Sequence, residues 1–348
     1  MNKMHEFYKN KTVLVTGHTG FKGSWLSVWL REMGATVIGV SLDPESEKGN
    51  FELTGLKDKI TDIRADIRDG QRMKQIFAEY KPGIVFHLAA QPIVRLSYSI
   101  PVETYETNVM GTIHIMEAIR EVKSVKSAVM ITTDKCYENT EQNHAYKESD
   151  PLGGYDPYSS SKGAAEIAIS SWRRSYHMPL ASARAGNVIG GGDRAADRII
   201  PDCIRAIEEN KTLEIRSPQA VRPWQHVLEP LSGYLLLAYK LFEEPQKYNQ
   251  AWNFGPETES VTTVWEVATR LIDTYGKGEL KDVSGLQQPH EAKLLMLDIA
   301  KAGEELGWTP RMNLEKTIEF TTDWYKRYQS EDVYKLCVEQ INKYINEF

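Results

Sequence analysis

The stretch Lys11–Gly34, KTVLVTGHTGFKGSWLSVWLREMG, decides the fold. Its first part, Lys11–Gly17, is a short run of β-branched and apolar residues that ends in glycine. Its second part, Phe21–Gly34, has apolar residues at helical spacing and a glycine at its end. The stretch therefore predicts a strand, a glycine-rich turn and a helix in direct succession.

The rest of the first half repeats this alternation. Helical patterns at 102–122 and 157–176 lie between short, continuous apolar runs with the sequences ATVIGVSL, GIVFHLAA, SAVMITT and PLASARAG. Continuous apolar strands are typical of a parallel sheet that is covered on both faces. Alternating strands and helices predict an α/β fold with a doubly wound parallel sheet.

The second half is less regular and predicts a smaller lobe laid against the sheet. The tail 331–348 has an apolar stripe on one helical face, which we expect to pack on the protein's own core rather than on another subunit. We expect the sheet domain to cover 1–188, with a returning segment near 223–257. Residues 189–222 and 258–348 are then the C-terminal lobe. Further helices are expected at 202–210, 230–242, 263–275, 298–306 and 314–327.

Composition excludes several classes of protein. The 348 residues suggest about two domains. The net charge of −6 argues against non-specific binding to nucleic acid or anionic membranes, and no apolar run is long enough to span a bilayer. The three cysteines lie far apart, and no apolar run precedes the first strand as it would in a signal peptide. We expect a cytoplasmic protein.

The glycine turn predicts a dinucleotide site. Gly17, Gly20 and Gly23 follow a strand and open a helix, where glycine permits a tight turn and the close approach of a pyrophosphate. The amides at the helix start then face the phosphates. Asp43 lies 20 residues after Gly23, near the end of the second apolar run. A carboxylate there accepts hydrogen bonds from a ribose and repels a 2′-phosphate, which favours NAD over NADP.

Tyr158 and Lys162 form a second constellation. They are four residues apart in a helical pattern, so they share one face. An ammonium beside a phenol stabilises the phenolate and lowers its pKa. Such a tyrosine can take a proton from an alcohol while a nicotinamide accepts hydride. On its own the pair is equally well an ordinary surface pair, but the glycine turn supports the catalytic interpretation.

With these motifs, the chain resembles the extended short-chain dehydrogenase/reductases, and within them the nucleotide-sugar 4,6-dehydratases, most closely the CDP-glucose branch. Further motifs carry the resemblance: HLAAQ at His87–Gln91, TNVMGT at Thr107–Thr112, TTDKCYEN, RAGNVIGGGD, RPWQHVLEP, and LGWTP at Leu306–Pro310. The resemblance implies a Rossmann domain with tightly held NAD, a nucleotide-sugar lobe, and a homodimer or homotetramer. It also implies cofactor contacts at Phe21, Asp66, Ile67, Leu88, Ala89 and Ala90.

The segment Thr133-Asp134-Lys135 ends an apolar strand, where ligands bind in an open α/β sheet. The resemblance implies that Thr133 bonds the sugar 4-oxygen and that Asp134 is the acid at the 6-hydroxyl, with a pKa raised by burial. The dTDP-glucose enzymes carry glutamate where this chain has Lys135. Lys135 is therefore the base at carbon 5, a group that orients Asp134, or a group that stabilises the enolate.

The nucleotide end is less sharply defined. Asn187 and Arg198 follow the sixth strand, and Arg222 is the preferred diphosphate clamp because its fork suits phosphate. Arg216, His290 and Glu291 are further candidates, although each is equally well a surface charge.

No metal site is expected, because His87 and His226 lack the spacing of ligand clusters. The main interpretation is thus a dehydratase that converts CDP-glucose to CDP-4-keto-6-deoxyglucose for deoxysugar synthesis. The rivals are a dehydratase for another nucleotide-hexose, a nucleotide-sugar 4-epimerase and an NAD-sensing regulator. Epimerases of this fold usually have small residues in place of Asp134 and Lys135, and sensors often lose the tyrosine.

Overall fold

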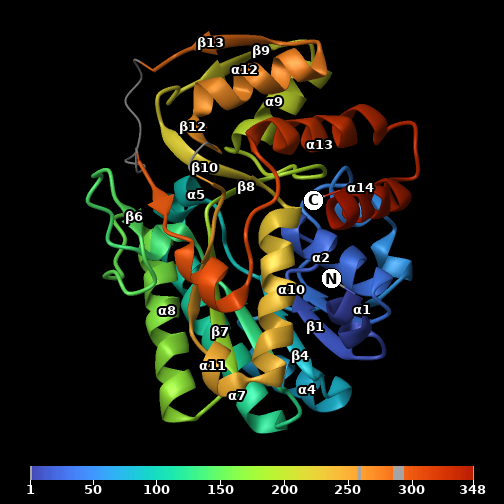
Figure 1. Cartoon of the computed structure of the whole chain (residues 1–348), viewed down its shortest axis with the longest axis vertical. Helices are drawn as coiled ribbons and strands as arrows, with labels where there is room; N and C mark the ends of the chain where they lie inside the picture. The colour runs from blue at the N-terminus through green and yellow to red at the C-terminus, as the bar shows by residue number, and fades with distance from the viewer. Residues whose placement is uncertain (1, 258–259, 285–293, 348) are drawn as a thin grey trace.

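The protein is built around a seven-stranded parallel sheet (Figure 1). A computed structural model describes residues 2–257, 260–284 and 294–347. The strand order is β11-β7-β5-β4-β1-β2-β3. The predicted doubly wound parallel sheet is confirmed. The bounds are β1 (Thr12–Thr16), β2 (Thr36–Ser41), β3 (Thr61–Arg64), β4 (Ile84–His87), β5 (Ser127–Ile131), β7 (Leu180–Ala185) and β11 (Ala251–Phe254).

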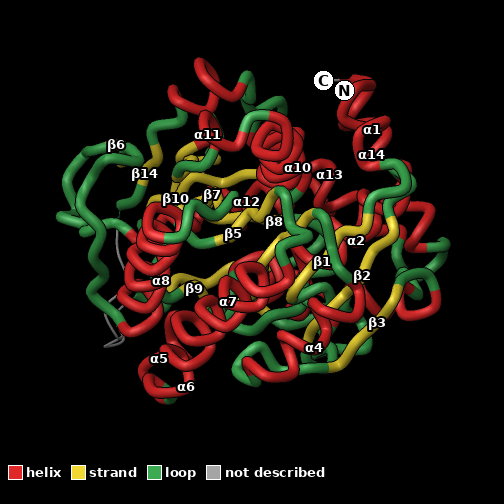
Figure 2. Tube along the Cα trace, turned by 90° about the horizontal axis from the view of Figure 1, so that it is seen from below, coloured by secondary structure: helices red, strands yellow, loops and turns green. Residues whose placement is uncertain are grey.

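Helices cover both faces of this sheet, as Figure 2 shows. Alternate strand residues face opposite sides. In β1, Leu14 belongs to one apolar cluster, while Val13 and Val15 belong to the other. The cluster around Leu14 is covered by α4 (Gly70–Tyr80), α7 (Thr112–Val122) and α8 (Pro157–Ser175), and the opposite one by α2 (Phe21–Glu32) and α10 (Leu228–Glu243).

The C-terminal helix α14 (Val333–Glu347) packs on the sheet domain beside α2, as expected from its apolar stripe. Leu336, Ile341 and Tyr344 are buried in the main core. An N-terminal helix, which the sequence pattern did not indicate, also joins this side. The N-terminal helix is α1 (Asn2–Tyr8). The other helices of the sheet domain are α3 (Asn50–Leu53), α5 (Val94–Ser99), α6 (Pro101–Tyr105) and α11 (Pro245–Tyr248), and shorter helical turns lie at Leu56–Asp58, Asp134–Cys136 and Ala302–Leu306.

The helix expected over 102–122 is interrupted by a π-helical turn, Glu106–Gly111. Within this turn Asn108 is buried, and its amide donates to Gln91 O and to Ser161 Oγ of α8 at 2.9 Å. The wider turn therefore directs a polar side chain towards two neighbouring segments, a need that apolar spacing does not reveal.

A smaller lobe lies at the top of Figure 1, above the carboxyl ends of the strands. Its small sheets pair β8 with β10, β10 with β12, and β9 with β13. The division of the chain into two domains at the expected boundaries stays a prediction. The elements of this region are β8 (Asn187–Ile189), α9 (Ile199–Glu208), β9 (Thr212–Ile215), β10 (Val221–His226), β12 (Val261–Thr263), α12 (Val264–Tyr275), β13 (Glu279–Asp282) and α13 (Leu314–Arg327).

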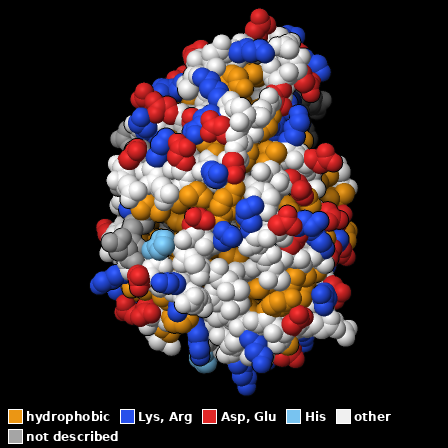
Figure 3. Space-filling view, turned by 90° about the vertical axis from the view of Figure 1, so that its right-hand side faces the viewer, with side chains coloured by type: hydrophobic (Ala, Val, Ile, Leu, Met, Phe, Trp, Pro, Cys, Tyr) orange, Lys and Arg blue, Asp and Glu red, His pale blue; other side chains and the backbone are white. Residues whose placement is uncertain are grey.

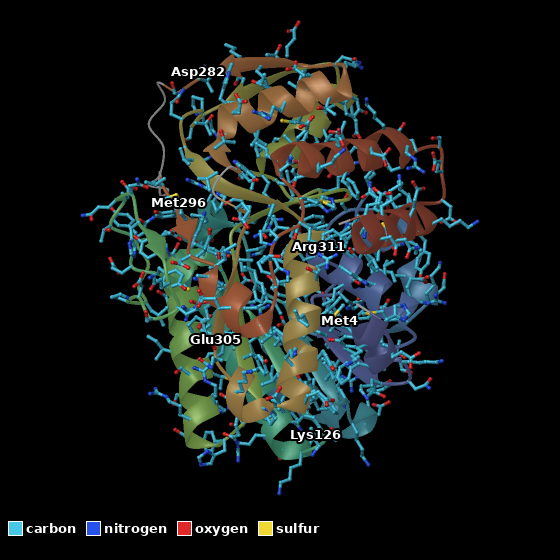
Figure 4. The ribbon with its side chains drawn as sticks, in the orientation of Figure 1. Met4, Lys126, Asp282, Met296, Glu305 and Arg311 are labelled. Carbon is cyan, nitrogen blue, oxygen red and sulfur yellow. The ribbon has the colours of Figure 1, made fainter. Side chains whose placement is uncertain are left out.

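A two-stranded pair, β6 (Ala145–Tyr146) and β14 (Met296–Leu297), lies beside α8. Figure 4 labels Asp282 at the end of β13 and Met296 in β14. His290 and Glu291, two of the predicted substrate residues, fall between these positions and lie outside the described residues.

The surface carries charge of both signs. On the face shown in Figure 3, basic and acidic side chains are interspersed rather than gathered in one field. Among the helices of the described residues, none is long and apolar enough to cross a membrane.

Candidate active site

One large cavity of about 1190 Å³ opens where the parallel strands end, between the sheet and the smaller lobe. This volume exceeds the roughly 300–1,000 Å³ of a typical single-ligand pocket, so it suits two ligands side by side. Most of the predicted site residues line it, although they lie far apart in the sequence. They are Gly17, Gly20, Phe21, Gly23, Asp43, Asp66, Ile67, Leu88, Ala89, Ala90, Thr133, Asp134, Lys135, Tyr158, Asn187, Arg198, Arg216 and Arg222.

The glycine turn forms a tight cradle at the floor of this cavity. Gly17 has a φ of +74°, and an added Cβ would lie 2.8 Å from Ala89 N. A Cβ on Gly23 would lie 2.1 Å from Gly17 O, so a side chain is excluded there as well. Gly20 is the N-cap of α2, whose first amides begin at the cavity. The turn therefore has the shape that a bound pyrophosphate requires.

Acidic residues lie at the far end of this cradle. The Asp43 side chain is 90% exposed, and its carboxylate lies 3.4 Å from Arg64 Nε. Asp66 accepts two hydrogen bonds from the Arg68 guanidinium, which hold the pKa of this carboxyl below its usual range against the effect of burial. Both carboxylates line the cavity.

Tyr158 lies in the first turn of α8, which Pro157 and the Asp156 cap begin. The Asp156 carboxylate accepts a hydrogen bond from Ser159 N at 2.9 Å. Burial raises the pKa of Tyr158 to about 12, while the Thr133 hydroxyl acts in the opposite direction. Tyr158 therefore needs a further positive charge nearby before it can act as a base at neutral pH.

Lys162 follows one helical turn later and is buried. Burial lowers the pKa of its ammonium to about 8, and the Glu166 carboxylate opposes this effect. Lys162 does not line the cavity itself. It follows Tyr158 by four residues on α8, so the two side chains share one face of the helix.

Asp134 has the environment of an acid. Its side chain is buried at the end of β5, and Thr133 Oγ1 donates to Asp134 Oδ1 at 2.9 Å. Burial raises the pKa of this carboxyl against the charges of Lys135 and Arg222, which confirms the direction expected from the sequence. Within the described chain, Asp134 Oδ2 is buried without a hydrogen-bond partner, so it can hold a proton for a ligand.

The four described arginine and asparagine candidates lie at different depths. Arg222 is buried on β10, and its charge acts on Asp134, so it lies near the predicted acid. Arg198 donates to both oxygens of Asp193, at 3.2 and 3.0 Å, and its charge acts on Tyr158.

Arg216 donates to Asp197 at 2.7 Å, and Arg95 of α5 lies 3.5 Å from the same Asp197 oxygen. Asn187 is the first residue of β8. The two arginines and Asp197 line the cavity from the sheet domain and from the lobe. Arg95 and Asp197 were not predicted, and a positive φ of 58° at Asp197 is visible only in the structure.

Lys22 is a further residue that the sequence analysis missed. It lies between Phe21 and Gly23 and lines the cavity. Burial and the neighbouring Arg198 and Lys162 charges lower its pKa to about 8. A lysine inside the glycine motif was the available signal.

The two histidines considered as metal ligands are buried. Burial lowers the pKa of His87 and of His226 to about 3, so both are neutral. Among the described residues, no group of three His, Cys, Asp or Glu side chains is placed to hold a metal ion.

A family model described as GDP-mannose 4,6 dehydratase matches residues 14–321. The chain belongs to this family of nucleotide-sugar 4,6-dehydratases. It is 48% identical to the CDP-glucose 4,6-dehydratase of Salmonella typhimurium over 350 aligned positions, which cover 98% of each chain. It is 30% identical to the dTDP-D-glucose 4,6-dehydratase of Mus musculus, over 91% of this chain and 89% of the mouse protein.

Solved structures share the fold of this family member. The dTDP-glucose 4,6-dehydratase of Bacillus anthracis, in complex with NAD, has a TM-score of 0.78 at 24% identity and covers 94% of this chain and 99% of its own. The UDP-glucose 4-epimerase of Thermus thermophilus, also in complex with NAD, has a TM-score of 0.79 at 24% identity, with coverages of 90% and 99%. Dehydratases and epimerases thus share one scaffold, and the residues of the cavity must distinguish them.

Proposed function

We propose that the chain is a CDP-glucose 4,6-dehydratase, a hydro-lyase that forms CDP-4-keto-6-deoxyglucose and water. One observation carries the proposal: Asp134, with a buried and unpaired carboxylate oxygen, lines the same cavity as Thr133, Lys135 and Tyr158. An epimerase needs the tyrosine but leaves the 6-hydroxyl in place, so it has no need of an acid there. The identity of 48% with a curated CDP-glucose enzyme supports the choice of nucleotide.

NAD is the cofactor of this activity. The cradle of Gly17, Gly20 and Gly23 fits its pyrophosphate, because side chains at Gly17 and Gly23 would collide with backbone atoms. Phe21, Asp66, Ile67 and Leu88–Ala90 would line the rest of its site, and Asp43 would favour an unphosphorylated ribose. When bound, NAD would supply the acceptor for the hydride of sugar carbon 4 and the source of the hydride for carbon 6.

The chain's own residues handle the protons. Tyr158 removes the proton of the 4-hydroxyl, assisted by the charge of Lys162 on the same helix face, while Thr133 bonds the same oxygen. The resulting ketone acidifies the hydrogen on carbon 5. Asp134 then gives its proton to the departing 6-hydroxyl, and Lys135 either takes the carbon-5 proton, orients Asp134 or stabilises the enolate.

Residues of the smaller lobe would bind the nucleotide. Asn187, Arg198, Arg216 and Arg222 supply neutral and cationic donors around the cavity, which suit a diphosphate. The position of Arg222 near Asp134 suggests that it meets the phosphate closest to the sugar. His290 and Glu291 remain candidates for the ribose or the base.

We further propose a homodimer or homotetramer in the cytoplasm. α6 and α8 lie side by side, and Val102 and Ile167 on them are 71% and 60% exposed, so a second copy that packs on these helices would cover large apolar side chains. The three cysteines, Cys136, Cys203 and Cys337, are free and buried, as is usual in a reducing compartment.

The decisive experiment supplies CDP-glucose with deuterium at carbon 4, in ordinary water. A dehydratase places the deuterium at carbon 6 of the keto sugar and a solvent proton at carbon 5. An epimerase leaves deuterium at carbon 4, a simple dehydrogenase loses it from the sugar, and a sensor moves nothing. Deuterium at any position other than carbon 6 overturns the dehydratase assignment.

The nucleotide is tested separately, by comparing CDP-, dTDP-, UDP- and GDP-hexoses through the alkali-induced absorbance of the keto sugar. CDP-glucose should turn over fastest by a wide margin. Equal turnover of dTDP-glucose refutes the choice of base but not the reaction.

A further inference from the structure

A buried ion pair joins the catalytic helix α8 to the neighbouring strand β7, and the proposed reaction steps do not use it. Glu166 is 2% exposed and Arg184 is 3% exposed. Arg184 Nη2 donates to Glu166 Oε2 at 2.7 Å. Burying two charges costs desolvation energy, so a pair this deeply buried does not by itself stabilise the fold. Its position points instead to a functional role.

The first reason lies on α8 itself. Glu166 follows Lys162 by four residues, so both side chains project from one face of the helix. Of the charges that act on Lys162, the Glu166 carboxylate has the largest effect, and it opposes the loss of the ammonium proton caused by burial. Arg184 in turn keeps Glu166 ionised, because it holds the pKa of this buried carboxyl below its usual range.

The second reason lies at the end of β5. The Thr132 hydroxyl donates to Glu166 Oε1, and Thr132 immediately precedes Thr133 and Asp134. Arg184 Nη1 donates to Tyr137 Oη at 2.7 Å, and Tyr137 immediately follows the short turn Asp134–Cys136. The ion pair therefore holds the segment that bears Asp134 at both of its ends.

The Tyr137 end is anchored further. Tyr137 Oη donates to Asn253 Oδ1 of β11 at 2.7 Å, and Asn253 Nδ2 donates to Tyr146 O at 2.8 Å. The segment 132–137 is thus fixed between α8, β7 and β11, a geometry that leaves Asp134 little freedom.

We propose that Glu166 and Arg184 are positioning residues: they hold the Thr132–Tyr137 segment in its catalytic place, and they set the charge of Lys162, which shares one face of α8 with Tyr158 and Glu166. Neither touches the cavity, so both act through other residues. The inference deepens the proposed function and rests on it for the roles of Tyr158 and Asp134.

The surroundings of Lys162 define what its titration should report. His87 is neutral at physiological pH because burial lowers its pKa to about 3, and burial also keeps the Cys136 thiol protonated by raising its pKa. Lys22 adds repulsion when it is charged. The titratable groups around Lys162 come from four elements. They are Tyr158 and Glu166 of α8, His87 at the end of β4, Cys136 in the turn after β5, and Lys22 at the start of α2.

The test compares variants of the NAD-loaded enzyme by NMR of isotope-labelled lysine, with the Lys162 signal assigned from its absence in Lys162→Arg. Glu166→Gln should move the Lys162 titration to lower pH, because it keeps the side-chain shape and removes the charge. Arg184→Met should do the same through protonation of Glu166, whereas Arg184→Lys keeps the charge and should preserve the titration.

Ser182→Ala is the matched control. The Ser182 hydroxyl donates to Glu166 Oε2 at 2.8 Å, so its loss removes a hydrogen bond from the same carboxylate and leaves the charge in place. The Lys162 titration should be unchanged in this variant. An unchanged titration in Glu166→Gln, or an equal shift in Ser182→Ala, overturns the proposal.

Kinetics supply a second readout. Each unit of pKa lost at Lys162 should lower the plateau of kcat about tenfold, with KM unchanged. The reason is that Tyr158 and Lys162 compete to lose one proton. When Lys162 loses it more easily, more of the enzyme carries a neutral lysine and less carries the Tyr158 phenolate. The acid limb of the pH profile should move to lower pH. A shared loss of kcat without this movement indicates a purely structural role. The NMR titration needs no turnover, so it still decides the proposal if CDP-glucose is not the substrate.

Discussion

Replacing Gly23 by alanine tests the dinucleotide cradle most directly. An added Cβ would lie 2.1 Å from Gly17 O, 2.7 Å from Gly17 C and 2.8 Å from His18 Cα. All three are backbone atoms, so the turn itself must move. Overpacking of this kind costs about 1–3 kcal/mol of unfolding free energy. A displaced turn should also weaken NAD binding by at least about tenfold, or about 1.4 kcal/mol.

Calorimetric titration with NAD and thermal unfolding measure the two effects. Gly20→Ala provides a graded comparison, because its Cβ would lie 3.3 Å from Gly17 O and a small shift accommodates it. Gly303→Ala is the matched control, since its nearest neighbours would be 3.9 Å away. Gly23→Ala with normal NAD affinity and an unchanged Tm would refute the reasoning, as would equal losses in Gly303→Ala.

Three other predictions concern groups that gain or lose a proton: the proposed base, the proposed acid and a buried carboxyl. Tyr158→Phe and Lys162→Ala should each lower the first oxidation by about 10²–10⁴-fold, measured as nicotinamide absorbance in a single turnover, and normal oxidation in either variant contradicts the base assignment. Asp134→Asn should still oxidise carbon 4 but stall before water is lost, and the absence of any oxidation would remove the support for Asp134 as the 6-hydroxyl acid. Burial raises the pKa of Glu229 to about 7, so between pH 4.5 and 7 the folded state keeps a proton on this carboxyl that the unfolded state has lost. The free energy of unfolding of the wild type should therefore fall as pH rises from about 4.5 to above 7, by up to about 3 kcal/mol. Thermal unfolding across this range should show a flatter profile for Glu229→Gln, and an identical pH slope in the two proteins disproves the linkage.

The Glu229 prediction rests on a contact between distant parts of the chain. Glu229 Oε1 accepts hydrogen bonds from the backbone amides of Arg311 and Met312, at 2.9 and 2.6 Å, and Tyr344 donates to its other oxygen at 2.9 Å. Figure 4 labels Arg311 beside the upper end of α10. The carboxyl is therefore buried by a loop and by α14, which local sequence patterns do not place next to it.

The parts of the fold that were predictable from sequence depend on local patterns. The glycine turn, the long amphipathic helices and the central apolar strands each need only neighbours in sequence to be recognised. β3 and β11 were missed as strands because β3 is short, polar and only partly buried at the sheet edge, while β11 is four residues long. Edge strands lack the continuous apolar run that marks a strand covered on both faces.

Some residues of the candidate site were likewise predictable from local sequence, whereas others depend on tertiary packing. Tyr158 and Lys162 were recognisable because a helix brings residues four apart onto one face. The link from Glu166 to Arg184 was not, because it spans 18 residues and depends on the packing of α8 against β7. The orientation of Lys22 into the cavity likewise depends on a turn conformation that the residue types alone do not fix.

The proposed acid and the proposed base make opposite demands on one cavity. Asp134 must hold a proton at neutral pH, whereas Tyr158 must lose one, and burial raises the pKa of both groups. Burial alone therefore suits the acid and disables the base. The compensation is placed asymmetrically. Lys162 and Glu166, which Arg184 pairs with, lie on the same helix as Tyr158, while Asp134 Oδ2 has no hydrogen-bond partner among the described residues. Because the pKa of Tyr158 remains at about 12 in the chain by itself, the base should form only when a positively charged nicotinamide is bound. Proton removal from the sugar is then coupled to an occupied cofactor site, which prevents the tyrosine from ionising in an empty one.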